Sequence, residues 1–133
     1  MKDIRHITVR QVMRDKVTFV DGAIDVMEAM RIMKRAGSTS LMVNRRDEND
    51  EHGMLLFSDI AKQVIGKDRA PERVNVFEIM AKPVLSVRPQ MSIRYCARLF
   101  EGFGISHAPV IENDKIIGIV SYYLLVLGGL DLD

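Results

Sequence analysis

Two stretches of the chain carry apolar residues at the spacing of an amphipathic helix. In each stretch, from Val26 to Met33 and from Ile93 to Phe100, apolar side chains recur every three or four positions. In the first stretch, charged residues occupy the opposite face. The pattern predicts the two longest helices of the protein. A glycine follows each of them, Gly37 and Gly104, and is expected to end the helix as a left-handed cap.

Short runs rich in β-branched and apolar residues, bounded by charged residues, glycine or proline, predict strands. These runs are Val17–Val20, Leu41–Val43, Met54–Leu56, Val84–Val87, Pro109–Ile111 and Ile116–Val120. The residues Glu112–Lys115 between the last two runs form a strong tight-turn signal and predict a hairpin. The corresponding link in the first half, Asn44–His52, is rich in acidic residues and arginine. We interpret it as a solvated loop, with a binding role as the alternative.

Two capping-box patterns predict a short helix at the start of each half. Thr8 precedes Gln11 by three positions, and Asn75 precedes Glu78 by three positions. In such a box the two side chains satisfy orphan amides at the helix start. Closing helices are expected near Ser58 and near Tyr122.

The whole pattern occurs twice. Val9–Met13 aligns with Val76–Met80 at a shift of 67 positions, and the same shift carries Val43 onto Val110. Each copy therefore has the order helix, strand, helix, strand, strand, helix, which predicts an α/β (α+β) fold of two similar units. We assign residues 1–66 to the first copy, 67–74 to a linker and 75–133 to the second copy.

Composition excludes some classes of function. The chain has 133 residues, a formal net charge of +1 and one cysteine. A chain with balanced charge has no general electrostatic attraction for nucleic acid or anionic lipid, so neither is an expected partner. A single cysteine, expected in the core, allows no internal disulfide, which fits a cytoplasmic protein. We find no signal peptide at Met1–His6. Ile116–Leu130 is too short to span a bilayer and is predicted to be a buried strand followed by a packed helix.

The duplicated pattern resembles a tandem pair of CBS domains, known as a Bateman module. The second copy has the family-like segment Gly104–Ile111, followed by Gly118–Ser121. The first copy has Gly37–Val43, followed by Gly53–Ile60. This resemblance covers almost the whole chain and implies a pseudo-twofold pair of small sheets packed with helices.

The resemblance also implies a function. CBS pairs commonly bind adenosine-containing ligands in clefts between the repeats, often form homodimers, and usually regulate another protein without doing chemistry themselves. The expected ligand is AMP, ADP or ATP, with S-adenosylmethionine or NAD as alternatives, and no cofactor is required. The alternative function is a ligand-free module for dimerisation or protein interaction. An unidentified regulated protein would be a further partner.

Asp59 matches the ribose-binding aspartate of the family. A carboxylate can accept hydrogen bonds from both ribose hydroxyls, although at a helix start its role could instead be capping. The second copy has Leu124 at this position, and Leu56 replaces the motif hydroxyl that Ser121 keeps. Neither copy therefore holds the complete motif.

Other binding candidates follow from the same resemblance. His107 matches a position that faces ligand phosphate, with a locally hydrogen-bonded residue as the alternative. The full set of predicted ligand-binding residues is Thr18, Ser40, Ser58, Asp59, Ser106, His107 and Ser121. For Thr18 a buried structural hydroxyl is equally compatible with the sequence, and for Ser106 local turn chemistry is the alternative. No catalytic residue and no metal site is predicted, since no Cys or His pair has metal-ligand spacing and no nucleophile motif is present.

Overall fold

The computed structural model describes residues 6–130, which form two compact units. We call Thr18–Val84 the continuous unit. The split unit consists of Met1–Val17 together with Leu85–Asp133, and it is described from residue 6 to 17 and from 85 to 130. The charged lead-in expected at residues 1–5 and the last three residues of the second copy lie outside the described residues.

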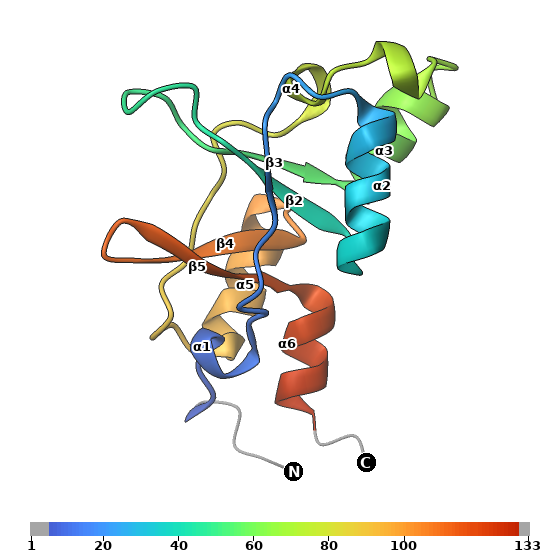
Figure 1. The fold of residues 1–133 in the computed structure, drawn as a ribbon. Helices are drawn as coiled ribbons and strands as arrows, with labels where there is room; N and C mark the ends of the chain where they lie inside the picture. Colours follow the sequence, from blue (N-terminus) through green and yellow to red (C-terminus); the bar gives the residue numbers. More distant parts are fainter. Residues whose placement is uncertain (1–5, 131–133) are drawn as a thin grey trace. The chain divides into compact units, whose positions relative to one another are not determined.

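The continuous unit contains a three-stranded sheet and several helices. In chain order these elements are β1 (Phe19–Val20), α2 (Val26–Ala36), β2 (Ser40–Val43), β3 (Gly53–Leu56), α3 (Phe57–Ile60), a π-helical turn (Ala61–Ile65), a 3₁₀ turn (Pro71–Arg73) and α4 (Val76–Ile79). Strand β2 is central, with β1 parallel to it and β3 antiparallel. Helices α2 and α3 lie together on one side of this unit (Figure 1).

The split unit is built on the same plan. Its elements are α1 (Val9–Val12), α5 (Ile93–Phe103), β4 (His107–Glu112), β5 (Lys115–Ser121) and α6 (Tyr122–Gly129). Strands β4 and β5 form an antiparallel hairpin. Its turn places Asn113 and Asp114 at φ 52° and 63°, as tight hairpin turns require. The predicted hairpin is confirmed.

Local signals for the long helices are also confirmed. Gly37 and Gly104 end α2 and α5 in the left-handed conformation, with φ of 62° and 65°. Glycine has no Cβ and therefore adopts this backbone conformation at low cost. Both glycine amides also donate hydrogen bonds to carbonyls of the last turn of their helix. The apolar stripes of both helices are buried, including Met33 and Phe100, which are both fully inaccessible.

The strand predicted at Val84–Val87 is wrong. Only Val87 pairs, in an isolated parallel bridge to Val110. In the continuous unit the amide of Met42 donates to the carbonyl of Thr18 at 3.0 Å, which extends the pairing of β1. The equivalent residue of β4 is Pro109, which has no N–H to donate. The ladder therefore stops after one bridge.

The opening helix of each copy packs into the unit that holds most of the other copy. Val9 is fully buried in the core of the split unit, and Val76 is fully buried in the core of the continuous unit. Equivalent backbone hydrogen bonds fix both helices: Val9 N to Met91 O and Ile93 N to Ile7 O, Val76 N to Ile24 O and Val26 N to Val74 O. The sequence copies and the compact units thus divide the chain at different places.

Gly118 in β5 and Gly53 in β3 allow the residues after α1 and α4 to approach these strands closely. A Cβ on Gly118 would lie 2.6 Å from Met13 Sδ, and a Cβ on Gly53 would lie 2.5 Å from Met80 Sδ. Each Met follows the opening helix, and each glycine belongs to a strand of the sheet in the same unit. The absence of a side chain at these two positions therefore lets the segments after α1 and α4 pair with β5 and β3.

Candidate functional site

The predicted ligand-binding residues fall into two groups. Thr18, Ser40, Ser58 and Asp59 belong to the continuous unit, and Ser106, His107 and Ser121 belong to the split unit. The first group lies where β2 begins and β3 ends, because Ser40 pairs with Leu56. Each group is described within its own unit.

Asp59 is the best-defined member of the first group. It is the third residue of α3, and its Oδ2 accepts a hydrogen bond from the backbone amide of Leu56 at 2.9 Å. This bond satisfies an orphan amide at the helix start and fixes the direction of the half-buried carboxylate. A carboxylate has about four acceptor sites, so it can accept hydrogen bonds from ligand hydroxyls in addition to a capping bond. The capping role is confirmed, and the ligand role stays a prediction.

Ser121 provides the other half of the same arrangement in the split unit. It is the N-cap of α6, and its Oγ accepts from the amide of Leu124 at 3.2 Å. The first copy therefore keeps the acid of the motif and the second keeps the hydroxyl. Each helix start is stabilised by one of the two hydrogen bonds that a complete Ser-x-x-Asp box would make.

Ser40, Ser106 and His107 take part in local contacts at the starts of β2 and β4. Ser106 Oγ lies 2.8 Å from Nδ1 of His107, and His107 pairs with Ser121 across the hairpin. In the continuous unit the amide of Ser40 donates to Ser38 Oγ, and Ser38 Oγ donates to the carbonyl of Ser40. These contacts show turn chemistry at both strand entries.

Thr18 is half-buried and Ser58 is exposed. The carbonyl of Thr18 accepts from the amide of Met42, so its backbone belongs to the sheet. Together with Ser40 and Asp59, these residues offer hydroxyl and carboxylate groups at one end of the sheet, which suits recognition of a polyhydroxylated ligand.

Cys96 is a core residue. It is fully inaccessible, and burial raises the pKa of its thiol to about 11. A thiol that stays protonated at neutral pH is a poor nucleophile, so Cys96 fits a packing role.

Within residues 6–130 no group of three or more His, Cys, Asp or Glu side chains could hold a metal ion. No helix in the same range is long and apolar enough to cross a membrane.

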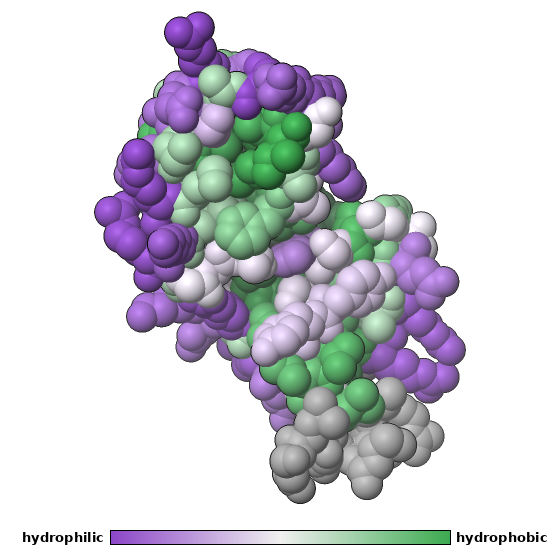
Figure 2. Space-filling model, turned by 90° about the vertical axis from the view of Figure 1, so that its right-hand side faces the viewer, coloured by the Kyte–Doolittle hydropathy of each residue, from purple (hydrophilic) through white to green (hydrophobic). Residues whose placement is uncertain are grey.

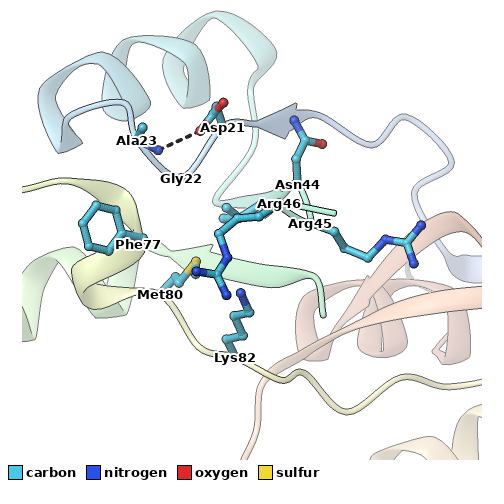
Figure 3. Close-up of a pocket in the computed structure, with 10 residues that line it drawn as sticks. Asp21, Gly22, Ala23, Asn44, Arg45, Arg46, Phe77, Met80 and Lys82 are labelled. Atoms are coloured by element: carbon cyan, nitrogen blue, oxygen red, sulfur yellow. Dashed lines mark hydrogen bonds between the residues drawn. The ribbon is translucent and has the colours of Figure 1, made fainter. Parts of the chain in front are cut away.

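The continuous unit also has a pocket at the opposite end of its sheet. This pocket, of about 680 Å³, lies where β1 and β2 end. It is lined by the turn Asp21–Ala23, the segment Val43–Arg46, Phe77, Met80 and Lys82. Figure 3 shows the side chains of Arg46 and Lys82 reaching toward one another, whereas Arg45 extends away from them.

Asp50 links two of these cations. Its Oδ2 lies 3.1 Å from Nε of Arg46, and its Oδ1 lies 2.7 Å from Nζ of Lys82. The hydrogen bond from Lys82, followed by those from Arg46, holds the pKa of the Asp50 carboxyl well below its usual range. We expected a solvated loop here, and the structure brings the start of this loop against the pocket. The sequence signals are the arginines and acidic residues of this link and its two extra residues relative to its counterpart.

The CBS domain family matches residues 9–66 and 76–126, which is most of the chain. The chain belongs to the CBS-domain family. The two matched segments are consistent with two CBS repeats, and the small sheets packed with helices agree with the solved CBS structures described below.

Among relatives, the CBS repeats are 36% identical over 118 residues to a homoserine O-acetyltransferase of Methanosalsum zhilinae. The match covers 88% of this chain but only 23% of that enzyme. The chain is also 25% identical to a CBS domain-containing protein of Bacillus subtilis, with 86% of this chain and 79% of that protein covered. A further relative in Methanopyrus kandleri is 28% identical over 120 residues, and the chain spans 60% of its length.

Solved structures confirm the CBS fold. A hexameric CBS-CP12 protein from bloom-forming cyanobacteria superimposes with a TM-score of 0.87 at 32% identity, covering 91% of this chain and 70% of the other. A signal-transduction protein with CBS domains from Burkholderia ambifaria gives 0.80 at 29% identity, with 90% of each chain covered. A CBS pair solved with 5′-methylthioadenosine and S-adenosyl-L-methionine gives 0.74 at 22% identity, covering 89% and 95%.

Proposed function

We propose that this CBS pair is a regulatory module that senses an adenosine-containing ligand, with AMP, ADP or ATP as the first candidates. In this proposal it regulates another protein in the cytoplasm and catalyses no reaction. A ligand of this kind acts through unequal affinity for two states of the module or its partner. S-adenosylmethionine and NAD are the other candidates.

The observation that supports this function best is the fixed carboxylate of Asp59. The amide of Leu56 holds its Oδ2, so the carboxylate is oriented before any ligand arrives. An oriented acceptor loses less freedom on binding, which favours affinity for a diol such as ribose. The structural relative solved with two adenosine compounds supports the ligand class.

The match to the homoserine O-acetyltransferase of Methanosalsum zhilinae supports a regulatory rather than a catalytic role for this chain. The chain matches less than a quarter of the homoserine O-acetyltransferase, so most of that enzyme lies outside the match. We infer that a module of this kind serves as an accessory to a catalytic chain.

The test is a thermal-shift screen against AMP, ADP, ATP, S-adenosylmethionine and NAD, with each hit measured by calorimetry. A ligand at a hundred times its dissociation constant adds about 2.7 kcal/mol to the free energy of unfolding. The Asp59→Asn variant can still accept the Leu56 amide through its side-chain oxygen, but it loses the charge. We expect it to bind the hit about tenfold or more weakly.

Asp25→Asn is the matched control. Asp25 caps α2 in the same unit, where its Oδ1 accepts from the amide of Glu28 at 2.9 Å. It should keep the wild-type affinity. A flat screen would refute the proposed ligand class, and equal affinity in wild type and Asp59→Asn would remove Asp59 from the site.

A second candidate function is protein association through α6. This helix and the residue after it are apolar on all sides: Leu125 faces the core, while other side chains are about 40–70% exposed. These exposed residues are Tyr122, Tyr123, Val126, Leu127 and Leu130. Figure 2 shows green, apolar surface on the lower half of the face that it draws. An uncovered apolar helix face is typical of an interaction surface, here for a homodimer or the regulated protein.

Light scattering on the purified chain tests this second function. A dimer that Leu127→Glu converts to a monomer would support association through α6, because a charge in an apolar interface is costly. The same variant should keep the melting temperature of the isolated chain, since Leu127 is 45% exposed. A dimer that survives the substitution would contradict it.

A further inference from the structure

The pocket at the end of β1 and β2 has the size and position of an independent ligand site. Its volume of about 680 Å³ falls within the range of small-molecule pockets, about 300–1,000 Å³. It lies where β2 ends at Val43, whereas Asp59 and Ser40 lie where β2 begins. The pocket is therefore separate from the predicted ribose-binding group of the same unit.

The lining of this pocket is cationic. Arg45, Arg46 and Lys82 contribute three positive charges, and Asp21 is the one acid among the lining residues. The loop after β2 contains four acidic residues, none of which is among the lining residues, whereas its two arginines are. Asp50, just behind, neutralises one charge through its contacts with Arg46 and Lys82. The balance remains positive, which favours an anion.

Arg45 has no acidic partner within the described part of the chain. It is exposed, and its positive charge, after the larger effect of burial, helps to lower the pKa of His52. A guanidinium offers five donors in a planar fork that matches phosphate oxygens. Arg45 is thus available to an anionic ligand without first breaking an ion pair.

The equivalent place in the split unit has different side chains. Counting from Val43 and Val110, the equivalent of Arg45 is Glu112, and the equivalent of Phe77 is Arg10. Arg10 and Glu112 form an ion pair with each other. In the continuous unit a phenyl ring and an arginine replace this pair, so the charge of the arginine is left for another partner.

The floor of the pocket is apolar. It consists of Val43, Phe77 and Met80, and the ring-bearing side chain of Phe77 is 54% exposed. Gly22 keeps this floor accessible, because a Cβ there would lie 3.3 Å from both Phe77 Cβ and Val43 Cγ1. An apolar floor beside a cationic rim suits a ligand with a ring or hydrocarbon part and an anionic end.

We propose that this pocket binds a small phosphorylated metabolite, with its phosphate on Arg45, Arg46 and Lys82 and its apolar part on Phe77 and Met80. The site is distinct from the Asp59 group and does not depend on the function proposed for it. A second ligand in the same unit would give the module a second input, separate from the adenosine signal.

Nuclear magnetic resonance of the ¹⁵N-labelled full chain tests the site, with phenyl phosphate, inorganic phosphate and phenol as probes. We expect saturable shifts at the amides of Gly22, Ala23, Asn44 and Arg45 with phenyl phosphate. Inorganic phosphate should bind more weakly at the same amides, because it lacks the apolar part. Phenol should bind least, since it lacks the charge.

Substitutions then assign the contacts. Arg45→Gln should weaken phenyl phosphate by about fivefold, the upper end for one exposed charge pair. Arg94→Gln, an exposed arginine on α5 of the other unit, should leave the affinity unchanged. Phe77→Ala should remove the advantage of phenyl phosphate over inorganic phosphate. Asp59→Asn should leave both probes unaffected, so this result is separable from the adenosine test.

Three results would overturn the proposal. Absence of saturable shifts at millimolar phenyl phosphate is the first. Shifts centred on Ser40 and Asp59 instead of Gly22 and Arg45 would place the anion at the other end of the sheet. Equal weakening by Arg45→Gln and Arg94→Gln would mean that only the overall charge attracts the probe.

Discussion

Replacing Val9 by alanine should destabilise the split unit, although Val9 belongs to the first sequence copy. Val9 is fully inaccessible and packs in the core that contains Phe100 and Val120. Val→Ala removes two methyl groups, worth about 1.6 kcal/mol of transfer free energy, and leaves a cavity. We therefore expect a loss of about 2–3 kcal/mol in the free energy of unfolding of this unit.

Amide hydrogen exchange can locate this loss. A decrease of 2–3 kcal/mol corresponds to exchange that is about 30- to 150-fold faster for amides that open with the affected core. In Val9→Ala these amides should be those of β4, β5 and α5. Val76→Ala is the reciprocal variant, because Val76 is equally buried in the other core. It should accelerate exchange in β2, β3 and α2.

Comparing which amides exchange faster in Val9→Ala and in Val76→Ala tests this assignment of the two helices. If Val9→Ala accelerated exchange in β2 and β3 while sparing β4 and β5, the assignment of α1 to the split unit would be refuted. Equal acceleration of both sheets in both variants would refute the reasoning that each core opens by itself.

Four further predictions concern single residues. The hydrogen bond from Lys82 and its companions lower the pKa of Asp50, so Asp50 stabilises the fold above the ordinary carboxyl pKa, near 3.9. The stability difference between wild type and Asp50→Asn should be constant at neutral pH and shrink below about pH 4 in urea titrations. Cys96 should react with a thiol reagent no faster than the protein unfolds, because it is inaccessible and its thiol pKa is about 11. In thermal melts, Gly118→Ala should destabilise by about 1–3 kcal/mol through overpacking. Gly102→Ala, where an added Cβ meets nothing within 4 Å inside a helix, should stabilise by up to about 1 kcal/mol.

The sequence predicted the elements that depend on local chemistry. The helix stripes, the glycine caps and the Glu112–Lys115 turn were all correct, because neighbouring residues alone determine each of them. The run Val84–Val87 has strand composition, yet it lacks a ladder because its partner position is Pro109, more than 20 residues away. A pattern read along one segment does not contain that information.

The candidate sites show the same limit. Asp59 could be found because its position in a motif is local, and its capping bond lies within three residues. The cationic pocket combines Arg45 from one loop with Phe77 and Lys82 from a segment more than 30 positions later. Only the placement of α4 in the core of the continuous unit brings these residues together, and no periodicity in the sequence predicts that placement.

The crossed membership of the opening helices has a consequence for synthesis on the ribosome. The continuous unit ends at Val84, so all of its segments exist once that residue has emerged. The split unit needs both α1, which precedes the continuous unit in the chain, and α6, which ends at Gly129. At about 5–20 residues per second, α1 waits on the order of several seconds for its partners after the continuous unit is complete. During that interval Val9 and Met13 have no native core to enter, which makes α1 a segment that nascent-chain chaperones have reason to cover.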